Sequence, residues 1–175
     1  MKDKQRIDLI VGLILILNAI VILLMPLFNI NDIKLLSVIS FTIISVINFC
    51  QFILTKESKD YESLLTFIAS IISLIVFSTL DITNKPKSLA ISLMIWISLM
   101  AVIKLKKADY YHDRNDRMWK IKVLSLVLFV ISGILSSINL AYDSSVQIIV
   151  LGFFLFIHGI LEFIEPVVKT LIKHS

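Results

Sequence analysis

The sequence predicts an all-α polytopic membrane protein, with six transmembrane helices arranged as three hairpin repeats. The chain has 175 residues, of which 58% are hydrophobic and 17% are charged, and its mean hydropathy is +0.94. An ordinary soluble domain is about 45–50% apolar and about 25% charged. A small soluble domain leaves a large share of its surface exposed, so it cannot bury this much apolar surface. The composition therefore argues against the common soluble α/β enzymes and indicates a single membrane domain over residues 1–175.

Six apolar runs are long enough, or nearly so, to cross a bilayer, which takes about 20 residues at about 1.5 Å of rise per residue. They cover residues 9–28, 35–54, 64–80, 88–103, 121–141 and 147–164. The third and fourth runs are the shortest and are expected to use flanking residues to complete the span. No run alternates polar and apolar residues as a strand of a membrane barrel would, so all six are predicted to be helices.

The connections between these runs differ in character. Residues 29–34, 81–87 and 142–146 are short and contain Asn, Asp, Pro or Ser, which is typical of tight turns. Residues 55–63 and 104–120 are more charged. This alternation predicts three hairpin repeats, roughly at residues 7–54, 62–103 and 120–166, with residues 104–120 as a cytoplasmic linker.

The distribution of basic residues predicts the orientation, because Lys and Arg near helix ends resist translocation. On the side of the predicted bundle away from the termini lie Lys34, Lys85 and Lys87. On the side of the termini lie Lys2, Lys4, Arg6, Lys56, Lys59, Lys104, Lys106, Lys107, Arg114, Arg117, Lys120, Lys122, Lys169 and Lys173. We therefore expect a multi-pass protein of a bacterial-type inner membrane with both termini cytoplasmic. The first run is expected to act as an uncleaved signal anchor, because no small-residue cleavage site follows it.

The three hairpins show weak internal similarity. The matching stretches are 18–20, 70–72 and 132–134 in the odd-numbered runs, and 48–52, 101–105 and 159–163 in the even-numbered runs. Each even-numbered run carries a small or polar residue followed, three positions later, by a polar or charged one. Parallel repeats are related by an axis along the membrane normal, so a three-fold arrangement with Asn18, Ser70 and Ser132 at equivalent sites is predicted.

Small residues on the last two runs predict close helix packing, because membrane helices associate where their backbones can approach. Ser132/Ser136 and Gly133/Ser137 are small-xxx-small pairs on the fifth run. Gly152 and Gly159 lie two turns apart on the sixth run.

These stretches carry a resemblance to a known family. Residues 129–135 read Phe-Val-Ile-Ser-Gly-Ile-Leu, and residues 152–162 read Gly-Phe-Phe-Leu-Phe-Ile-His-Gly-Ile-Leu-Glu. With the three tandem hairpins, they resemble the bacterial HdeD acid-resistance membrane protein family over most of the chain. The chain departs from the pattern at Asn18 and at Ser70-Ile71, where a small residue plus glycine is more typical, and its fourth run lacks glycine. The resemblance implies the six-helix fold and a role in survival at low pH, and it implies no biochemical activity.

His158 and Glu162 form the sharpest intramembrane polar pair. At positions i and i+4 they share one face of the sixth run, so an imidazole and a carboxylate can meet there. Such a pair can relay protons or sense pH, because histidine titrates near neutrality. The structural alternative is that the pair only hydrogen-bonds within the bundle, with Asn18 and Asn48 as the expected partners. Both interpretations place the two side chains in the interior, because lipid exposure of such groups is costly.

A scattered set of amides lies in the same helical runs, at Asn18, Asn48, Gln51 and Asn139. These side chains either line a hydrated path or form interhelical hydrogen bonds, each worth on average about 0.6 kcal/mol in membranes. Cys50 is the sole cysteine, so an intrachain disulfide is impossible, and it is expected to be a small buried apolar residue.

The predicted linker is the most polar part of the chain. Residues 104–122 carry seven basic residues and three aspartates, interleaved with Tyr110, Tyr111 and Trp119. Aromatic and basic residues favour the headgroup zone of an anionic leaflet, so the linker is predicted to lie on the inner leaflet and not to bind nucleic acid. The expected headgroup contacts are Lys106, Lys107, Arg114, Arg117, Trp119 and Lys120.

The sequence carries no motif of a known enzyme class, because phosphate-loop, HExxH, CxxC and GxSxG patterns are all absent. The three histidines are too dispersed for a catalytic metal site, and no cofactor is expected. Three functions remain: a non-enzymatic membrane protein linked to acid or envelope stress, a small transporter or channel subunit with a polar path near His158 and Glu162, and a scaffold for another membrane protein. Besides the anionic lipid bilayer, a second copy of the chain is a possible partner.

Overall fold

The computed structural model describes residues 3–55, 61–81, 85–142 and 146–172, and the regular structure in these ranges is helical. The elements are α1 (Asp3–Leu24), the short 3₁₀ helix η1 (Met25–Phe28), α2 (Ile33–Leu54), α3 (Tyr61–Thr79), α4 (Pro86–Asp113), α5 (Met118–Tyr142) and α6 (Gln147–Ile172). All six α-helices are long and apolar enough to cross a membrane. The protein is therefore an all-helical, multi-pass membrane protein.

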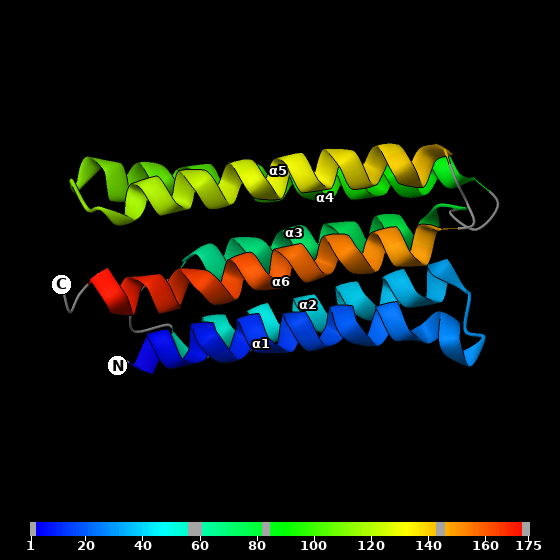
Figure 1. The fold of residues 1–175 in the computed structure, drawn as a ribbon, viewed down its shortest axis with the longest axis horizontal. Coiled ribbons are helices and arrows are strands. Elements are labelled where there is room, and N and C mark those ends of the chain that lie inside the picture. Colours follow the sequence, from blue (N-terminus) through cyan, green and yellow to red (C-terminus); the bar gives the residue numbers. More distant parts are fainter. Residues whose placement is uncertain (1–2, 56–60, 82–84, 143–145, 173–175) are drawn as a thin grey trace.

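The six helices run side by side with alternating direction, so both termini lie at the same end of the bundle (Figure 1). We call this the terminal end and the opposite one the distal end. Helices α1, α3 and α5 run from the terminal end to the distal end, and α2, α4 and α6 run in the opposite direction. This alternation gives three antiparallel hairpins in chain order, α1–α2, α3–α4 and α5–α6, as the sequence predicts.

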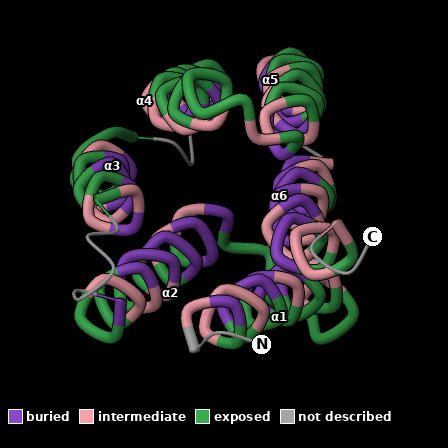
Figure 2. The backbone as a smooth tube through the Cα atoms, turned by 90° about the vertical axis from the view of Figure 1, so that its left-hand side faces the viewer, coloured by how far each residue is buried: buried purple, intermediate pink, exposed green. Residues whose placement is uncertain are grey.

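The helices form a closed ring, in which each helix contacts the next one in sequence and α6 returns to α1 (Figure 2). The most extensive contacts are those of the α1–α6, α4–α5 and α2–α3 pairs. Neighbouring hairpins are therefore packed against each other more closely than the two helices within each hairpin. This arrangement is consistent with three repeats around one axis.

Glycines close the ring between the first and last helices. A Cβ atom added at Gly12 would lie 2.7 Å from the Cα of Phe163, and one added at Gly159 would lie 2.8 Å from the backbone nitrogen of Ile16. The backbones of α1 and α6 thus approach so closely that any larger residue at either glycine meets main-chain atoms. The predicted role of Gly159 in close helix packing agrees with this contact.

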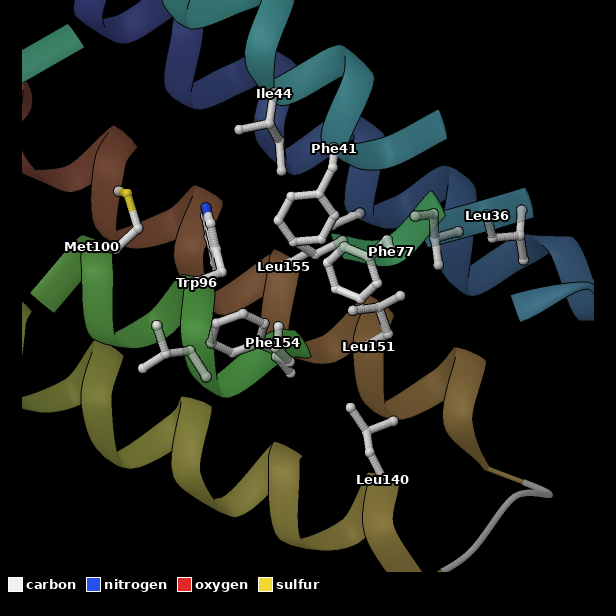
Figure 3. Packing of buried hydrophobic residues seen from close by; sticks show 14 of the residues in the cluster. Leu36, Phe41, Ile44, Phe77, Trp96, Met100, Leu140, Leu151, Phe154 and Leu155 are labelled. Carbon is white, nitrogen blue, oxygen red and sulfur yellow. The ribbon is translucent and has the colours of Figure 1, made fainter. Parts of the chain in front are cut away.

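The centre of the ring is filled by aromatic side chains from five helices, which we call the aromatic cluster: Phe41, Phe77, Trp96, Phe129 and Phe154. The centroid of the Trp96 indole lies 5.2 Å from the centroid of the Phe41 phenyl ring and 5.8 Å from that of Phe154, and both contacts are edge-to-face. Figure 3 shows these rings interlocking between α2, α4 and α6. The cluster separates the two ends of the bundle interior.

The burial pattern of the even helices follows the register predicted for the repeats. Equivalent positions that are buried in all three helices are Leu36, Leu89 and Gln147; Ser40, Leu93 and Leu151; and Ile44, Ile97 and Leu155. In the odd helices the pattern favours a register one residue away from the predicted one, with Ala19, Ser70 and Gly133 all buried. Ser132, which the sequence comparison placed opposite Ser70, is only half-buried because the glycine beside it faces α4.

The predicted linker over residues 104–120 is wrong. Helix α4 continues to Asp113, and only residues 114–117 connect it to α5. The helix continues because one face of this polar segment packs into the bundle, where Lys104 is 4% exposed and Ala108 is 2% exposed. The turn itself is set by Asn115, whose φ of 51° is left-handed, and by Asp116, whose Oδ1 accepts a 2.9 Å hydrogen bond from the backbone nitrogen of Met118.

Candidate functional site

Six charged side chains from four helices converge inside the terminal end of the ring. We call them the charged cluster: Glu62 of α3, Lys104 and Lys107 of α4, Lys122 of α5, and Glu162 and Glu165 of α6. Lys104, Lys122 and Glu165 are buried, and the other three are half-buried. Charged groups at such positions in a membrane protein are costly and mark candidate functional sites.

The charged cluster is fully paired and carries no net charge. Its close ion pairs are Lys104–Glu162, Lys122–Glu165 and Lys107–Glu62. The Nζ of Lys107 also lies 3.8 Å from the Oε2 of Glu165, which joins two of the pairs. Buried ions lose their hydration, and opposite charges within contact distance offset that loss. The pairs therefore tie α3, α4, α5 and α6 together at the terminal end.

Helix periodicity explains why these residues meet. Lys104 and Lys107 are three residues apart on α4, and Glu162 and Glu165 are three residues apart on α6, so each pair shares one helix face. The helices α4 and α6 run in the same direction, with equivalent positions separated by 58 residues. The two lysines consequently face the two glutamates in register.

A cavity of about 60 Å³ lies within the charged cluster, enough for a small number of water molecules. All six helices contribute to its wall, with Asp8 from α1 and Gln51 from α2 joined by a 2.9 Å hydrogen bond from Nε2 to Oδ1. Two further lining residues, Tyr111 and Lys169, are joined by a 2.9 Å hydrogen bond. The cavity is thus lined by polar or charged side chains from every helix of the bundle.

His158 lies between the charged cluster and the aromatic cluster. It lines the cavity, is 2% exposed, and its ring centroid lies 5.2 Å from that of Trp96 and 5.3 Å from that of Phe129. Its Nδ1 is 3.9 Å from the Oε1 of Glu162 and has no hydrogen-bond partner within the described ranges. The imidazole therefore lies in the interior, as the sequence analysis expects, with one nitrogen free to bind water.

The expected hydrogen-bond partners of His158 prove to be wrong. Asn48 lines the same cavity, but its Nδ2 donates to the carbonyl oxygen of Ile44 at 2.7 Å. Asn18 is buried, and its Nδ2 has no partner in the part of the chain that the structure describes. Two aromatic rings pack against the imidazole instead. Of the other amides, Gln51 lines the cavity and Asn139 is exposed on the outside of the bundle.

The predicted headgroup contacts divide into two groups. Lys106, Arg114, Arg117 and Lys120 are exposed, whereas Trp119 is half-buried. Lys107 faces the interior and belongs to the charged cluster, so its assignment as a headgroup contact is wrong. Lys104 and Lys122 also turn inward, which leaves this segment with far less outward positive charge than its sequence suggests. Cys50, expected to be buried, is exposed on α2.

Sequence reasoning identified Glu162 and His158 but missed Glu62, Glu165 and the inward-facing lysines. The available signal was the matched three-residue spacing of Lys104/Lys107 and Glu162/Glu165 at equivalent repeat positions. The described ranges contain no group of three side chains suited to hold a metal ion. No family model matches the chain, and comparison with curated proteins and with solved structures finds no similar protein.

Proposed function

We propose that this chain is a non-enzymatic inner-membrane protein, with both termini cytoplasmic, that responds to acidification through the charged cluster. The observation that carries the proposal is that three carboxylate–lysine pairs, made by buried and half-buried side chains, tie four helices together at the terminal end. The resemblance to the HdeD acid-resistance family supports a role in acid stress.

The proposed response follows from the pairing. At neutral pH each carboxylate of the charged cluster balances a lysine. Protonating a carboxylate removes its charge but leaves the lysine buried without a counter-charge, which is strongly destabilising. Water must then enter, or the helices must separate, to solvate the lysine. Acidification at the terminal end therefore loosens the contacts among α3, α4, α5 and α6.

Other titratable groups face the same cavity. Helix α1 contributes Lys4 and Asp8, and α6 contributes His158 and Lys169, whereas the lining residues of α2 are the uncharged Asn48 and Gln51. Protonation of His158 would place a positive charge 3.9 Å from the Glu162 carboxylate, where it competes with Lys104 for that one negative charge. The cavity thus gathers groups whose protonation favours opening.

The structural test is pH-dependent stability. We expect the purified protein in detergent to lose stability as the pH falls, and the protection factors of its α4–α6 amides, corrected for the intrinsic exchange rate at each pH, to decrease. The double variant Glu162→Gln/Glu165→Gln imitates the protonated state, so it should exchange faster already at neutral pH and respond less to acid. Asp109→Asn, on the exposed side of α4, is the matched control. A wild type whose protection factors do not decrease as the pH falls would contradict the proposal.

The biological test is acid survival. A deletion strain complemented with the wild-type gene should survive an acid challenge better than one complemented with Glu162→Gln/Glu165→Gln at equal expression. Equal survival of both strains and of the uncomplemented deletion would remove the link to acid stress.

A small transporter or channel is the second candidate, and one observation favours it. The polar cavity is built by all six helices around the axis of the ring and reaches His158 and Glu162. The aromatic cluster closes the far side, so a path through the bundle requires that these rings move.

A further inference from the structure

We propose that the axis of the ring is a gated proton path, which water enters from the terminal end and which Trp96 closes. The cavity forms its open half, and the aromatic cluster forms its barrier. The proposal is independent of the acid response, because a bundle can loosen in acid without conducting protons.

The open half ends at unsatisfied polar atoms. His158 lines the inner part of the cavity, and its Nδ1 has no hydrogen-bond partner among the described residues. A buried imidazole nitrogen without a partner is rare, because such groups are normally satisfied by protein or by water. Water in the cavity would satisfy Nδ1. It would also connect His158, the innermost titratable group of the open half, to the aqueous phase at the terminal end.

Unpartnered hydroxyl groups continue the polar line toward the barrier. Ser45 of α2 and Ser73 of α3 are buried, and neither Oγ has a hydrogen-bond partner within the described ranges. Each serine lies one helical turn nearer the terminal end than the aromatic residue of its own helix, Phe41 or Phe77, whose rings are 4.6 Å apart. The two hydroxyls therefore lie between the cavity and the barrier.

The barrier depends most on Trp96. Its indole is fully buried and contacts the rings of Phe41 and Phe154, which Figure 3 shows beside it. It also contacts the rings of Phe129 and His158, so it joins the barrier to the inner end of the cavity. An apolar constriction of this kind blocks conduction by excluding water. The Nε1 of Trp96 has no acceptor in the described part of the chain, so water entering the barrier would gain a hydrogen bond from it.

Two hydroxyl groups lie at the barrier and beyond it. The hydroxyl of Ser40 is buried at the level of Phe41 without a hydrogen-bond partner in the described ranges, and Ser37, one turn nearer the distal end, is buried and donates its hydroxyl to the carbonyl oxygen of Ile33 at 2.7 Å. Most other side chains buried in the distal half are apolar, Leu36, Leu140 and Leu151 among them, so hydroxyl groups lie on both sides of the aromatic cluster and the cavity adjoins those on the terminal side. Displacing the indole would let a chain of water connect the two sets, and protons would pass along it.

The first experiment measures proton flux in liposomes that contain the full chain and an internal pH dye, with a potassium gradient and valinomycin as the driving force. Wild type should leak little more than empty liposomes, and Trp96→Ala should raise the flux by an order of magnitude because it removes the constriction. Trp119→Ala, at the terminal end and outside the aromatic cluster, should behave as wild type. A folded Trp96→Ala protein with wild-type flux would overturn the proposal.

The second experiment measures water access without removing the large side chain of Trp96. It uses single cysteines in a Cys50→Ser background. Silver ion, a thiol reagent small enough to follow water, is added to the terminal face of membrane vesicles, and the remaining thiols are counted after denaturation. Asn48→Cys in the cavity should react, whereas Ser37→Cys beyond the barrier should be protected. Val46→Cys, which is 55% exposed on the outer face of the same helix, should also be protected by lipid.

Two results would overturn the proposal here. If Asn48→Cys is as unreactive as Val46→Cys, no water reaches the cavity. If Ser37→Cys is as reactive as Asn48→Cys, the aromatic cluster is no barrier. Acid-dependent loosening with no flux through Trp96→Ala would uphold the acid response and refute the proton path, so the two proposals fail separately.

Discussion

Lys104 of α4 and Glu162 of α6 occupy equivalent positions of two repeats, 58 residues apart, and pair with each other across the interior. The same separation relates Tyr111 to Lys169, which share a 2.9 Å hydrogen bond. Because the two helices run in the same direction, equivalent positions lie at the same depth, and opposite charges there can pair. The repeat thus determines which residues meet as well as the overall shape of the ring.

The Lys122–Glu165 pair is the most buried of the three, so it provides the clearest stability test. Glu165→Gln should destabilise the bundle by about 3–5 kcal/mol, because it leaves Lys122 buried without a counter-charge. Unfolding in mixed micelles of increasing dodecyl sulfate content measures the change.

A double variant separates loss of the pair from loss of one partner. Lys122→Met/Glu165→Leu should recover most of the stability, since apolar replacement of a whole buried pair is often neutral. Lys106→Met, on the exposed side of α4, should change little. A double variant as unstable as Glu165→Gln alone would show that the pair makes a net favourable contribution.

The four glycines should differ in their tolerance of alanine. Gly12→Ala and Gly159→Ala meet backbone atoms of the opposing helix, so each should destabilise the α1–α6 contact by about 1–3 kcal/mol. Gly133→Ala meets side-chain atoms of Ile97, and Gly152→Ala meets side-chain atoms of Leu23 and Ile22. Both should be milder, because side chains can move where a backbone cannot. Thermal denaturation in one detergent compares all four. Equal effects at all four positions would contradict this account of ring closure.

Membrane topology is testable with reporter fusions. Insertions at Ile30 and Lys85, in distal connections, should report an external location, and one at Arg117, in a terminal-end connection, should report the cytoplasm. A third distal position, Ser144, lies outside the described residues. A cytoplasmic signal at Lys85 would reverse or remove the second hairpin.

The exposed basic residues at the terminal end should select anionic lipid. We expect Lys106→Gln/Arg117→Gln/Lys120→Gln to reduce the extra thermal stability that phosphatidylglycerol gives over phosphatidylcholine in nanodiscs, by up to about 1 kcal/mol per charge. Lys34→Gln and Lys87→Gln, at the distal end, are the matched controls. An unchanged lipid preference would leave these side chains without a role in headgroup binding.

The six transmembrane helices could be predicted from the sequence because side chains that contact lipid must be apolar, which produces long apolar runs. The predicted limits fell short at the ends of α1, α4 and α6, where charged residues continue the helices. The sequence predicts a surface position for Lys104 and Lys107, because a lysine is normally exposed. The two lysines face the interior because Glu162 and Glu165 lie there to pair with them, and the location of these glutamates follows only from how the helices pack.

The partners of His158 also lay beyond the sequence. Asn18 and Asn48 lie at the expected depth, and Asn48 lines the same cavity. Rotation about the helix axis determines which side chain reaches the imidazole, and apolar runs that lack a strong polar face do not define that rotation. Trp96 was recognisable as a mid-helix residue, whereas its position at the centre of five helices follows from ring closure.

Contact between α1 and α6 has a consequence for biosynthesis. Helix α1 must wait for α6 before its face around Gly12 is covered, because the ring cannot close until α6 has been inserted. A chain that stalls or is truncated before α6 lacks Glu162 and Glu165, so Lys104 and Lys122 remain without their carboxylate partners in the membrane. Incomplete chains therefore display both an uncovered helix face and unpaired charges, features by which membrane quality-control proteases can distinguish them from the finished protein.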